Sequence, residues 1–393
     1  MRTPRQIGLR KAEARLLFLG PATSCHTLRW VRHLRGLGHE VLLATVHPRT
    51  GVDLPMVSLV GAPVEGHMPA RLLPQAIASL RGVARTFQPD VTIAYYMTSY
   101  GLLAALSGLR PCIGAAAGGD VLVDEYDGPL KRLRSWFAAR IAVHHCDRML
   151  AWAPHVADRL VELGFARERV LVQPRGVDLA TFRYRVPRLR LGRDALRILS
   201  LRWLKPLYRV DTLLAAIERL ADRSLPCEVI IAGDGPERRH LEAVAAGIVG
   251  PVRITFVGRV KAERIPFLLK WADVYVSTST TDGASASLFE ALATGVYPVV
   301  SDIPPNREFV RDGETGRLFP VGDAEALAER LCELYRDDER RRRSVEAARH
   351  LVVTRFDFEM NMRRIDAYVL GSARPGAPAE RERSRSAEGE RGS

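Results

Sequence analysis

The chain has 393 residues, of which 47% are hydrophobic and 26% charged, a composition that is ordinary for a soluble globular protein with two domains. No apolar run approaches the roughly 18 residues needed to span a bilayer, and no continuous apolar segment of the secretory type precedes the first expected strand. The five cysteines are odd in number and widely scattered, so reduced thiols in the cytosol are expected.

The positive charge is concentrated in one half of the chain. Residues 1–190 contain 26 basic and 14 acidic side chains, which gives a net charge of +12. Residues 191–393 contain 32 basic and 31 acidic side chains, which gives a net charge of +1. A basic first half would attract an acidic acceptor, an anionic membrane or nucleic acid. Genomic preference for arginine is the alternative, because only five of the 58 basic residues are lysine. That preference explains the type of basic residue but not its placement.

The first half of the chain alternates short apolar runs with longer amphipathic stretches. The apolar runs predict buried strands over residues 15–20, 40–46, 91–95 and 112–116. The amphipathic stretches predict helices over residues 27–36, 69–88, 101–107, 129–144 and 154–163. Such alternation is typical of a parallel, doubly wound sheet.

The same alternation returns in the second half. Strands are expected over residues 197–201, 228–233, 254–257, 274–277 and 297–301, and helices over 210–220 and 237–246. The break between the halves falls in residues 182–194, which mix charge, Pro and Gly without a clear period. The fold class is therefore α/β, with one Rossmann-like domain over residues 1–185 and another over 195–355. Residues 371–393 have almost no apolar side chains and are expected to be disordered.

Residues 281–323 carry the pattern of a nucleotide site. Asp282 and Glu290 stand on either side of a turn of small residues that opens into an apolar run, and a strand follows. Small residues allow a ligand to approach the backbone, and the N-terminus of a helix attracts phosphate. A carboxylate one turn into that helix suits the hydroxyls of a ribose. This arrangement is typical of the carboxyl ends of a parallel sheet.

The run that begins at Glu290 reads EALATGVYPVV, and further motifs stand in order along the chain. They are GVD at 176–178, IAGDGPE at 231–237, FVGRV at 256–260, DIPPNRE at 302–308 and DGETGRLFP at 312–320. Together with an opening segment from His26 to Val41, they cover about residues 16–368 and resemble the family-4 retaining glycosyltransferases. The order and spacing of the motifs, rather than any one of them, carry the resemblance.

The resemblance implies a GT-B fold, in which two Rossmann-like domains face a cleft and a C-terminal helix, here residues 356–370, crosses back to the first domain. It also implies transfer of a sugar from a nucleoside diphosphate sugar to a hydroxyl acceptor, with retention of configuration and without a cofactor. A UDP sugar is expected in preference to a GDP sugar, and the acceptor is a glycan, a glycolipid or a natural product. The absence of an Asp-x-Asp pair at a strand end agrees with a metal-independent reaction.

Two carboxylates receive roles from the resemblance. Glu290 would bind the nucleotide ribose, although the sequence from Ser287 to Glu290 also has the form of a helix capping box. Asp282 replaces the first Glu of the family pattern and would hold hydroxyls of the donor sugar. The alternative for Asp282 is a simple Asp-Gly turn.

Two cations would bind the donor diphosphate. Arg202 matches the arginine of the family, and its alternative is a solvated surface residue. The family lysine that follows is missing, because an insertion of one residue puts Tyr208 at its position. Lys205 is the nearest ammonium group and is expected to replace the missing charge, unless it is merely exposed. These groups would stabilise the departing diphosphate.

Several residues complete the candidate site. Asp120 would contact hydroxyls of the donor or acceptor, or would serve as a turn or helix cap. Donor-binding roles are expected for Gly233, Asp234, Gly258, Arg259, Val260, Ser287 and Leu288. For the glycine motifs, a tight turn is the alternative and is compatible with binding.

The stretch from Lys131 to Arg140 is basic with an apolar side. It is expected either to lie on an anionic membrane surface, at the cytoplasmic face, or to pack into its own domain with solvated arginines. Other GT-B enzymes, such as an epimerase or a phosphorylase, are the first rival function. A non-catalytic basic binding module is the second rival, but no nucleic-acid-binding motif supports it.

Overall fold

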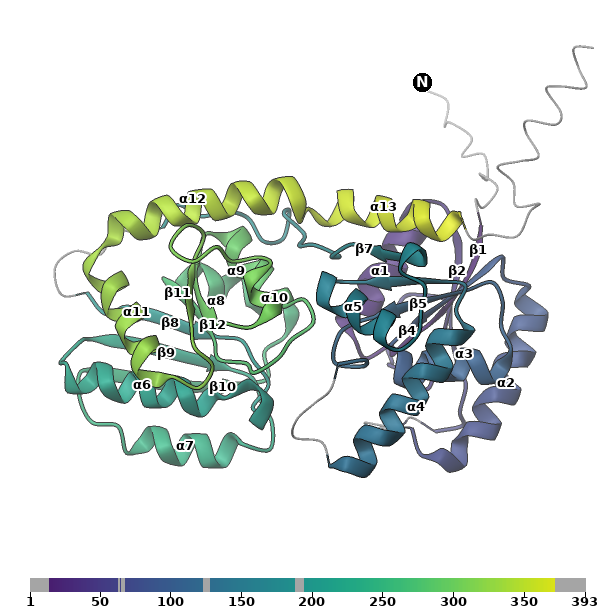
Figure 1. Ribbon diagram of the computed structural model, residues 1–393, viewed down its shortest axis with the longest axis horizontal. Coiled ribbons are helices and arrows are strands. Elements are labelled where there is room, and N and C mark those ends of the chain that lie inside the picture. Colours follow the sequence, from purple (N-terminus) through teal and green to yellow (C-terminus); the bar gives the residue numbers. More distant parts are fainter. Residues whose placement is uncertain (1–13, 63, 65–67, 123–127, 188–193, 372–393) are drawn as a thin grey trace, which may run out of the picture. The chain divides into compact units, whose positions relative to one another are not determined.

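The computed structural model describes residues 14–62, 64, 68–122, 128–187 and 194–371 (Figure 1). The described chain divides into two compact units, each built around one parallel sheet. The first unit contains residues up to Leu122, then Pro129–Gln173 and the chain from Met362 onward. The second contains Gly128 and Pro174–Asn361. The predicted pair of doubly wound parallel sheets is confirmed.

The sheet of the first unit has seven parallel strands in the order β3-β2-β1-β4-β5-β6-β7. The strands are β1 (Arg15–Leu19), β2 (Glu40–Thr45), β3 (Met56–Ser58), β4 (Val91–Tyr95), β5 (Cys112–Ala116), β6 (Arg148–Ala151) and β7 (Val170–Val172). β1 pairs with both β2 and β4, so the direction of strand order reverses there. In open α/β sheets, ligands bind beyond the carboxyl ends of strands at such a reversal.

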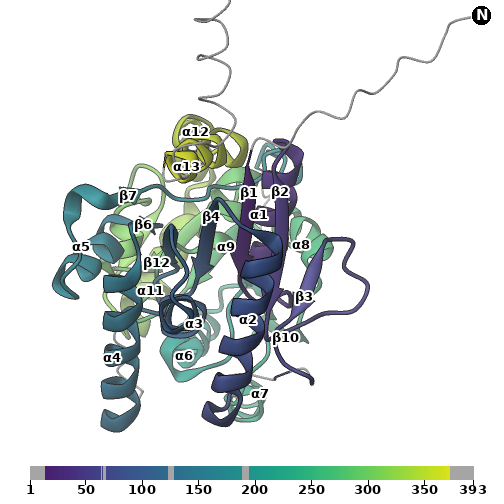
Figure 2. The same ribbon diagram turned by 90° about the vertical axis from the view of Figure 1, so that its right-hand side faces the viewer.

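Helices cover this sheet. They are α1 (Cys25–Gly36), α2 (Leu73–Phe87), α3 (Leu102–Ser107), α4 (Pro129–His145) and α5 (Pro154–Glu162), with short helices η1 (Ala70–Leu72), η2 (Met97–Gly101) and η3 (Arg167–Arg169). α2, α3 and α4 lie side by side along the sheet (Figure 2). In the core, the ring of Trp30 on α1 lies 5.0 Å from Phe18 and 5.4 Å from Trp152, both edge-on. Such aromatic contacts add to the stabilisation by burial.

The sheet of the second unit has six parallel strands in the order β10-β9-β8-β11-β12-β13. They are β8 (Leu196–Ser200), β9 (Cys227–Ala232), β10 (Val252–Gly258), β11 (Val274–Ser277), β12 (Tyr297–Ser301) and β13 (Arg317–Phe319). β8 pairs with β9 and β11, which is again a reversal of strand order.

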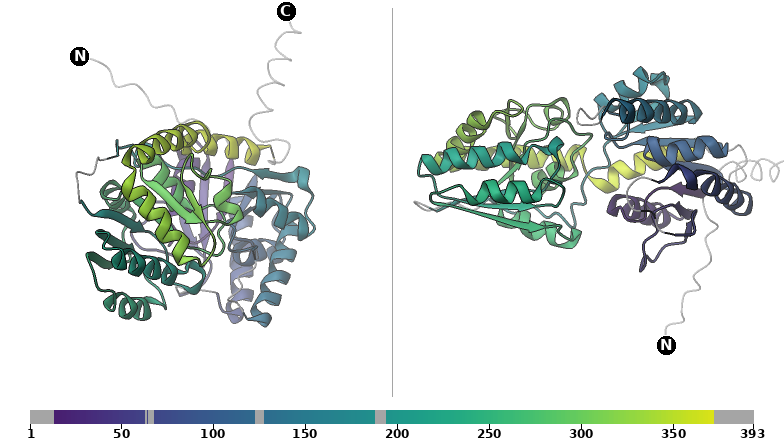
Figure 3. Two further views of the ribbon diagram at one scale, coloured as in Figure 1. Left: turned by 60° about the vertical axis from the view of Figure 1, so that its left-hand side comes forward. Right: turned by 90° about the horizontal axis from the view of Figure 1, so that it is seen from below.

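The helices of the second unit are α6 (Val210–Asp222), α7 (Arg238–Ala246), α8 (Ile265–Trp271), α9 (Ala286–Thr294), α10 (Pro304–Arg307), α11 (Ala324–Arg336) and α12 (Asp338–Arg355), with short η4 (Pro206–Tyr208) and η5 (Ala262–Arg264). α11 and α12, in yellow-green, lie along the sheet (Figure 3, left). Buried side chains of α6 and α11 share the core with the strands.

The segment after Gln173 packs on the second unit. Val177 N–H donates to Phe356 O, just beyond α12, at 2.8 Å, and the carbonyl of Val177 accepts from Phe358 N–H at 3.1 Å. Arg185 N–H donates to Thr294 O at 3.1 Å. The final helix, α13 (Phe358–Leu370), belongs to the first unit from Met362 onward. Residues 188–193 of the expected linker and residues 372–393 of the expected tail lie outside the described residues.

Candidate functional site

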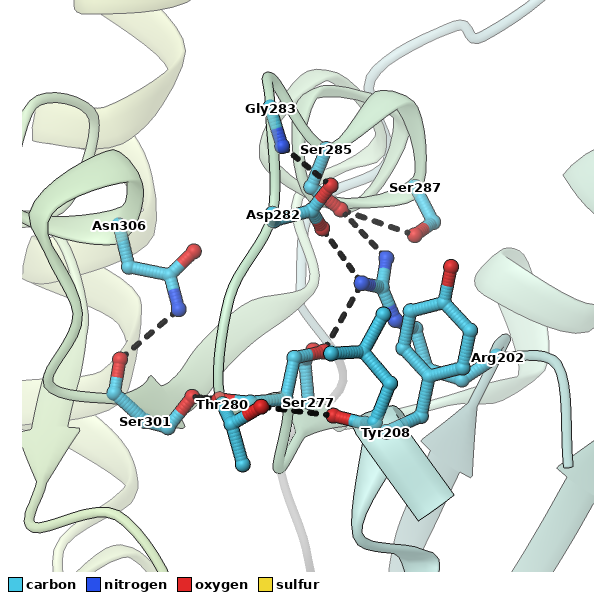
Figure 4. Close-up of polar contacts among 12 residues, drawn as sticks. Arg202, Tyr208, Ser277, Thr280, Asp282, Gly283, Ser285, Ser287, Ser301 and Asn306 are labelled. Atoms are coloured by element: carbon cyan, nitrogen blue, oxygen red, sulfur yellow. Dashed lines mark hydrogen bonds and ion pairs between the residues drawn. The ribbon is translucent and has the colours of Figure 1, made fainter. Parts of the chain in front are cut away.

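The guanidinium of Arg202 lies at the carboxyl edge of the second sheet, two residues beyond β8. It is buried and donates hydrogen bonds to three side chains that follow β11 (Figure 4). Nη1 donates to Ser285 Oγ at 2.9 Å, and Nη2 donates to Ser279 Oγ at 2.8 Å and also to the carboxylate of Asp282. Arg202 and Asp282, which were both expected from the sequence to bind the donor, are therefore in direct contact.

The ion pair with Asp282 sets the charge of Arg202. Burial alone would lower the pKa of Arg202, but the charge of Asp282 and its hydrogen bond, together with nearby Tyr275 and Tyr208, outweigh burial and raise it. The guanidinium therefore remains charged in a site where removing its partner would leave a buried, poorly compensated cation. Asp282 is held in turn, because Gly283 N–H donates to its Oδ1 at 2.8 Å. The chain bends at Gly283, next to the ion pair. Contact of Asp282 with a donor sugar stays a prediction.

The N-terminus of α9 faces the same cluster. Ser285 is the N-cap residue but makes no side-chain hydrogen bond to the helix amides, because its hydroxyl receives Arg202 instead. Ser287 lies inside the first turn, where its Oγ is 2.7 Å from Tyr275 OH and 3.3 Å from Ser285 Oγ. The first amides of a helix lack internal partners and, without a side-chain cap, suit an anion.

The capping-box alternative for Glu290 is wrong, because α9 begins at Ala286 and Ser287 is not its N-cap. Glu290 lies in the second turn of α9 and is half-buried. Leu288, on the same helix, is buried. The structure thus places Glu290, Ser287 and Leu288 on the helix that begins beside Arg202.

Lys205 does not join Arg202 in the structure. Its Nζ lies 5.6 Å from the ring centre of Trp203, an exposed residue, and the guanidinium carbon of Arg259 lies 5.9 Å from the same ring. The neighbour of Arg202 on this loop is Tyr208, whose ring centre is 4.5 Å from the guanidinium carbon. Replacement of the family lysine by Lys205 stays a prediction.

The glycine motif after β9 holds the Arg202 loop. A Cβ atom on Gly233 would lie 1.9 Å from Arg202 O, and one on Gly235 would lie 2.2 Å from Leu204 O. Leu204 N–H donates to the carbonyl of Asp234 at 3.0 Å. Only glycine permits this approach, so the motif positions Arg202 whether or not it also touches a ligand.

The second glycine motif begins at Gly258, the last residue of β10. Gly258 has a φ of +69°, and a Cβ atom there would lie 2.9 Å from Arg238 Nη1. Arg259 is exposed and Val260 is half-buried. Glycine is favoured at this φ, which agrees with the interpretation of the motif as a tight turn. Contact of its backbone with the nucleobase stays a prediction.

Asp120 lies in the first unit and is fully engaged by its own loops. Its carboxylate accepts backbone N–H groups from Met97 at 2.6 Å, Ala117 at 2.9 Å and Gly118 at 3.0 Å. Burial raises the pKa of Asp120, and these hydrogen bonds oppose that rise. This is the geometry of the turn or cap alternative.

Polar residues that the sequence analysis missed also lie at the carboxyl edge of the first sheet. Tyr100 OH is 3.0 Å from Thr45 Oγ1 and 2.8 Å from His47 Nδ1, and burial raises the pKa of Tyr100 to about 12. Tyr96 has a φ of +73°, which is strained for a bulky side chain and starts the π-helical turn η2. The aromatic and polar run directly after β4, YMTSYG, was the available signal.

A doubly wound parallel sheet with an arginine and a helix N-terminus at its carboxyl edge is the arrangement of a nucleotide-binding α/β domain. Comparison with known proteins gives the family. Residues 187–351 match the model of the glycosyl transferases group 1, and residues 24–181 match that of glycosyltransferase family 4. The chain belongs to these family-4, group 1 glycosyltransferases of the GT-B fold.

The curated relatives are similar to this chain over only part of their length. The phosphatidyl-myo-inositol mannosyltransferase of Mycolicibacterium smegmatis is 33% identical over 170 residues, which is 43% of each chain. The lipopolysaccharide core biosynthesis glycosyltransferase LpsE of Rhizobium meliloti is 29% identical over 61% of this chain and 69% of its own. The match therefore spans less than half of the first of these relatives.

Solved structures share the fold over nearly the whole chain. HepE from Anabaena, solved in complex with UDP-glucose, has a TM-score of 0.75 at 17% identity, covering 91% of this chain and 100% of its own. The sucrose-phosphate synthase of Thermosynechococcus elongatus has a TM-score of 0.75 at 18% identity, covering 90% and 98%. The GT-B prediction is confirmed.

No helix in the described ranges is long and apolar enough to cross a membrane. Within the same part of the chain, no three His, Cys, Asp or Glu side chains are grouped so that they could hold a metal ion.

Proposed function

We propose that this protein transfers a sugar from a nucleoside diphosphate sugar to a hydroxyl acceptor, with retention of configuration and without a metal or cofactor. A UDP sugar is the proposed donor and a glycan or lipid-linked glycan the proposed acceptor. The observation that carries the proposal is the buried guanidinium of Arg202, held beside the uncapped N-terminus of α9. Both features supply positive charge to one place.

The chemistry requires that charge. Breaking the bond between sugar and diphosphate builds negative charge on the leaving group and positive charge on the anomeric carbon. A fixed guanidinium and helix amides stabilise the first without reorganising during the reaction. Arg202 is already positioned by Ser279 and Ser285, so a diphosphate would take the place of Asp282 at its Nη2 group.

The two carboxylates have separate tasks in this mechanism. When phosphate takes the guanidinium, Asp282 is released toward the sugar, where its oxygens accept hydrogen bonds from hydroxyl groups. Glu290, one turn farther along α9, accepts hydrogen bonds from the ribose diol. The leaving phosphate oxygen takes the proton of the acceptor hydroxyl on the same face, which yields retention.

The names of similar proteins support the substrate classes. Relatives include a phosphatidyl-myo-inositol mannosyltransferase and a lipopolysaccharide core glycosyltransferase, which favour a lipid or glycan acceptor. HepE was solved with UDP-glucose, which favours a UDP sugar. The donor sugar itself is left to experiment.

The test is to incubate the protein with a panel of nucleotide sugars and an acceptor. The measurements are the released nucleotide, any free phosphate and the anomeric configuration of the product. Release of nucleoside diphosphate with a retained glycoside is expected. Glu290→Gln should raise the KM for the donor about tenfold or more, because the ribose loses a hydrogen bond to a charged group. Glu263→Gln is the control: Glu263 lies on the exposed η5, and its replacement should leave the KM unchanged. Free phosphate, or epimerisation of the nucleotide sugar, would show one of the rival enzymes instead.

A further inference from the structure

Helix α4 presents its large apolar side chains to solvent. Leu130, Leu133, Trp136, Phe137 and Ile141 have exposures of 71%, 53%, 37%, 52% and 47%. The side chains that α4 buries are smaller, namely Ala139, Ala142 and Val143. A helix that packs only into its own domain has the opposite arrangement, with its large apolar side chains inside. We call the five exposed residues the α4 face.

Four basic side chains accompany the α4 face. The helix carries Lys131, Arg132, Arg134 and Arg140, and its 17 residues include no Asp or Glu. Arg140 is fixed beside the face, because its guanidinium lies 5.5 Å from the ring centre of Trp136 and donates to Leu163 O at 3.2 Å. The face therefore combines acyl-like and cationic surface on one helix.

We propose that the α4 face docks on an anionic membrane surface. Leucine, isoleucine and aromatic side chains enter the boundary between headgroups and acyl chains, while arginine and lysine attract anionic lipids. Aromatic side chains favour this depth. Docking depends only on α4 and not on the proposed transfer reaction.

The other occupants fit this surface less well. A second copy of the chain would bring the four cations of one helix against those of another, which is repulsive. Nucleic acid would use the cations but would leave Leu130, Leu133 and Ile141 without an apolar partner. An anionic bilayer satisfies both parts of the face.

The position of α4 gives docking a functional consequence. The helix follows β5 and the Asp120 loop, which lie at the carboxyl edge of the first sheet. It stands at one end of the row formed by α2, α3 and α4 (Figure 2). If the proposed function holds, docking would bring the carboxyl edge of the first sheet, where the acceptor is expected to bind, close to the membrane surface. The hydroxyl group of a lipid-linked acceptor is displayed at that surface.

The experiment is sedimentation of the full chain with sucrose-loaded vesicles of phosphatidylcholine, either alone or mixed with phosphatidylglycerol. One variant, Leu133→Gln/Phe137→Gln, removes apolar surface, and another, Arg132→Gln/Arg134→Gln, removes charge. Phe267→Gln is the matched control, because Phe267 is 68% exposed on α8 of the second unit. All of these sites are exposed, and circular dichroism and Tm verify that each variant is folded.

We expect binding to the mixed vesicles and little binding to phosphatidylcholine alone. The partition coefficient should fall about fivefold for each arginine removed, and about tenfold or more when the two apolar side chains are replaced. High salt should weaken binding of the wild type, and Phe267→Gln should bind like the wild type. Absence of selective binding, unchanged binding by the α4 variants, or a dimer that these variants dissociate would overturn the proposal.

Discussion

The ring of Tyr208 lies 4.5 Å from the guanidinium carbon of Arg202, at the chain position where the family resemblance places a lysine. An aromatic face attracts a cation, whereas a second ammonium group would repel it. The main chain of Tyr208 is also fixed, because Thr278 Oγ1 donates to its carbonyl at 2.7 Å. Arg202 is thus held by an aromatic ring as well as by Asp282 and two serines.

Tyr208→Lys should change stability and donor affinity in opposite directions. In the free protein it replaces a cation–π contact, worth roughly 1 kcal/mol, by two adjacent cations, so Tm should fall. With a bound diphosphate, the added ammonium should strengthen binding of UDP. Calorimetry and titration of UDP measure the two effects.

Tyr208→Phe is the control for this pair of effects, since it keeps the ring and loses only the hydroxyl. It should leave both Tm and UDP affinity close to those of the wild type. A Tyr208→Lys variant that binds UDP no more tightly than Tyr208→Phe would contradict the expected contact of position 208 with the diphosphate.

Arg202→Lys should reduce kcat by about 100-fold to 1,000-fold, the effect of removing one preorganised donor from a developing anion. A lysine retains the charge but cannot reach Ser279, Ser285 and the leaving group with a planar fork. Steady-state kinetics with the donor identified by the panel measure this loss. Arg264→Lys, at an exposed position of the same unit, should retain full activity; an Arg202→Lys enzyme as active as that control would exclude Arg202 from the reaction.

Gly233→Ala should prevent the second unit from folding normally. The new Cβ would lie 1.9 Å from Arg202 O, which is backbone and cannot rotate away, so a loss of about 3 kcal/mol or more is expected. Gly247→Ala is the matched change, because its Cβ would be 3.4 Å from Val244 O at an ordinary φ. Chemical denaturation of both variants tests this, and equal midpoints would contradict the close approach.

Most of the fold could be predicted because the longer strands are continuous apolar runs. The five residues of β4 and of β12 are all buried, and buried parallel strands have this pattern. The strands that were missed are β6, with four residues, and β3, β7 and β13, with three residues each. A run of three residues is too short to show a period, and its place in the sheet depends on neighbours that are distant in sequence.

The pairing of side chains in the candidate site could not be predicted from the sequence. The motif spacing identified Arg202 and Asp282, but only the folded loops show that they form an ion pair. The sequence from Ser287 to Glu290 matches a capping box, in which Ser287 would be the N-cap. In the structure α9 begins one residue before Ser287, so Ser285 is the N-cap, and the hydroxyl of Ser285 accepts a hydrogen bond from Arg202. Tertiary contacts override such local patterns.

The stability of the second unit should depend on pH through Glu333. Burial alone would raise the pKa of Glu333, but Arg317 and Arg330, which both donate to its carboxylate, outweigh burial and lower it below 4.5. A carboxylate with a lowered folded-state pKa stabilises the fold fully above its unfolded pKa, and this contribution disappears as the pH falls through the folded value.

Glu333→Gln removes this contribution and should therefore lower Tm at neutral pH more than at acidic pH. Between about pH 5 and pH 3, the Tm of the wild type should fall more steeply than that of the variant. Glu329→Gln is the matched control, since it makes the same change at an exposed position of α11 and should follow the wild-type curve. Parallel curves for the wild type and Glu333→Gln would mean that the pairs with Arg317 and Arg330 contribute nothing to stability, as is common for exposed ion pairs.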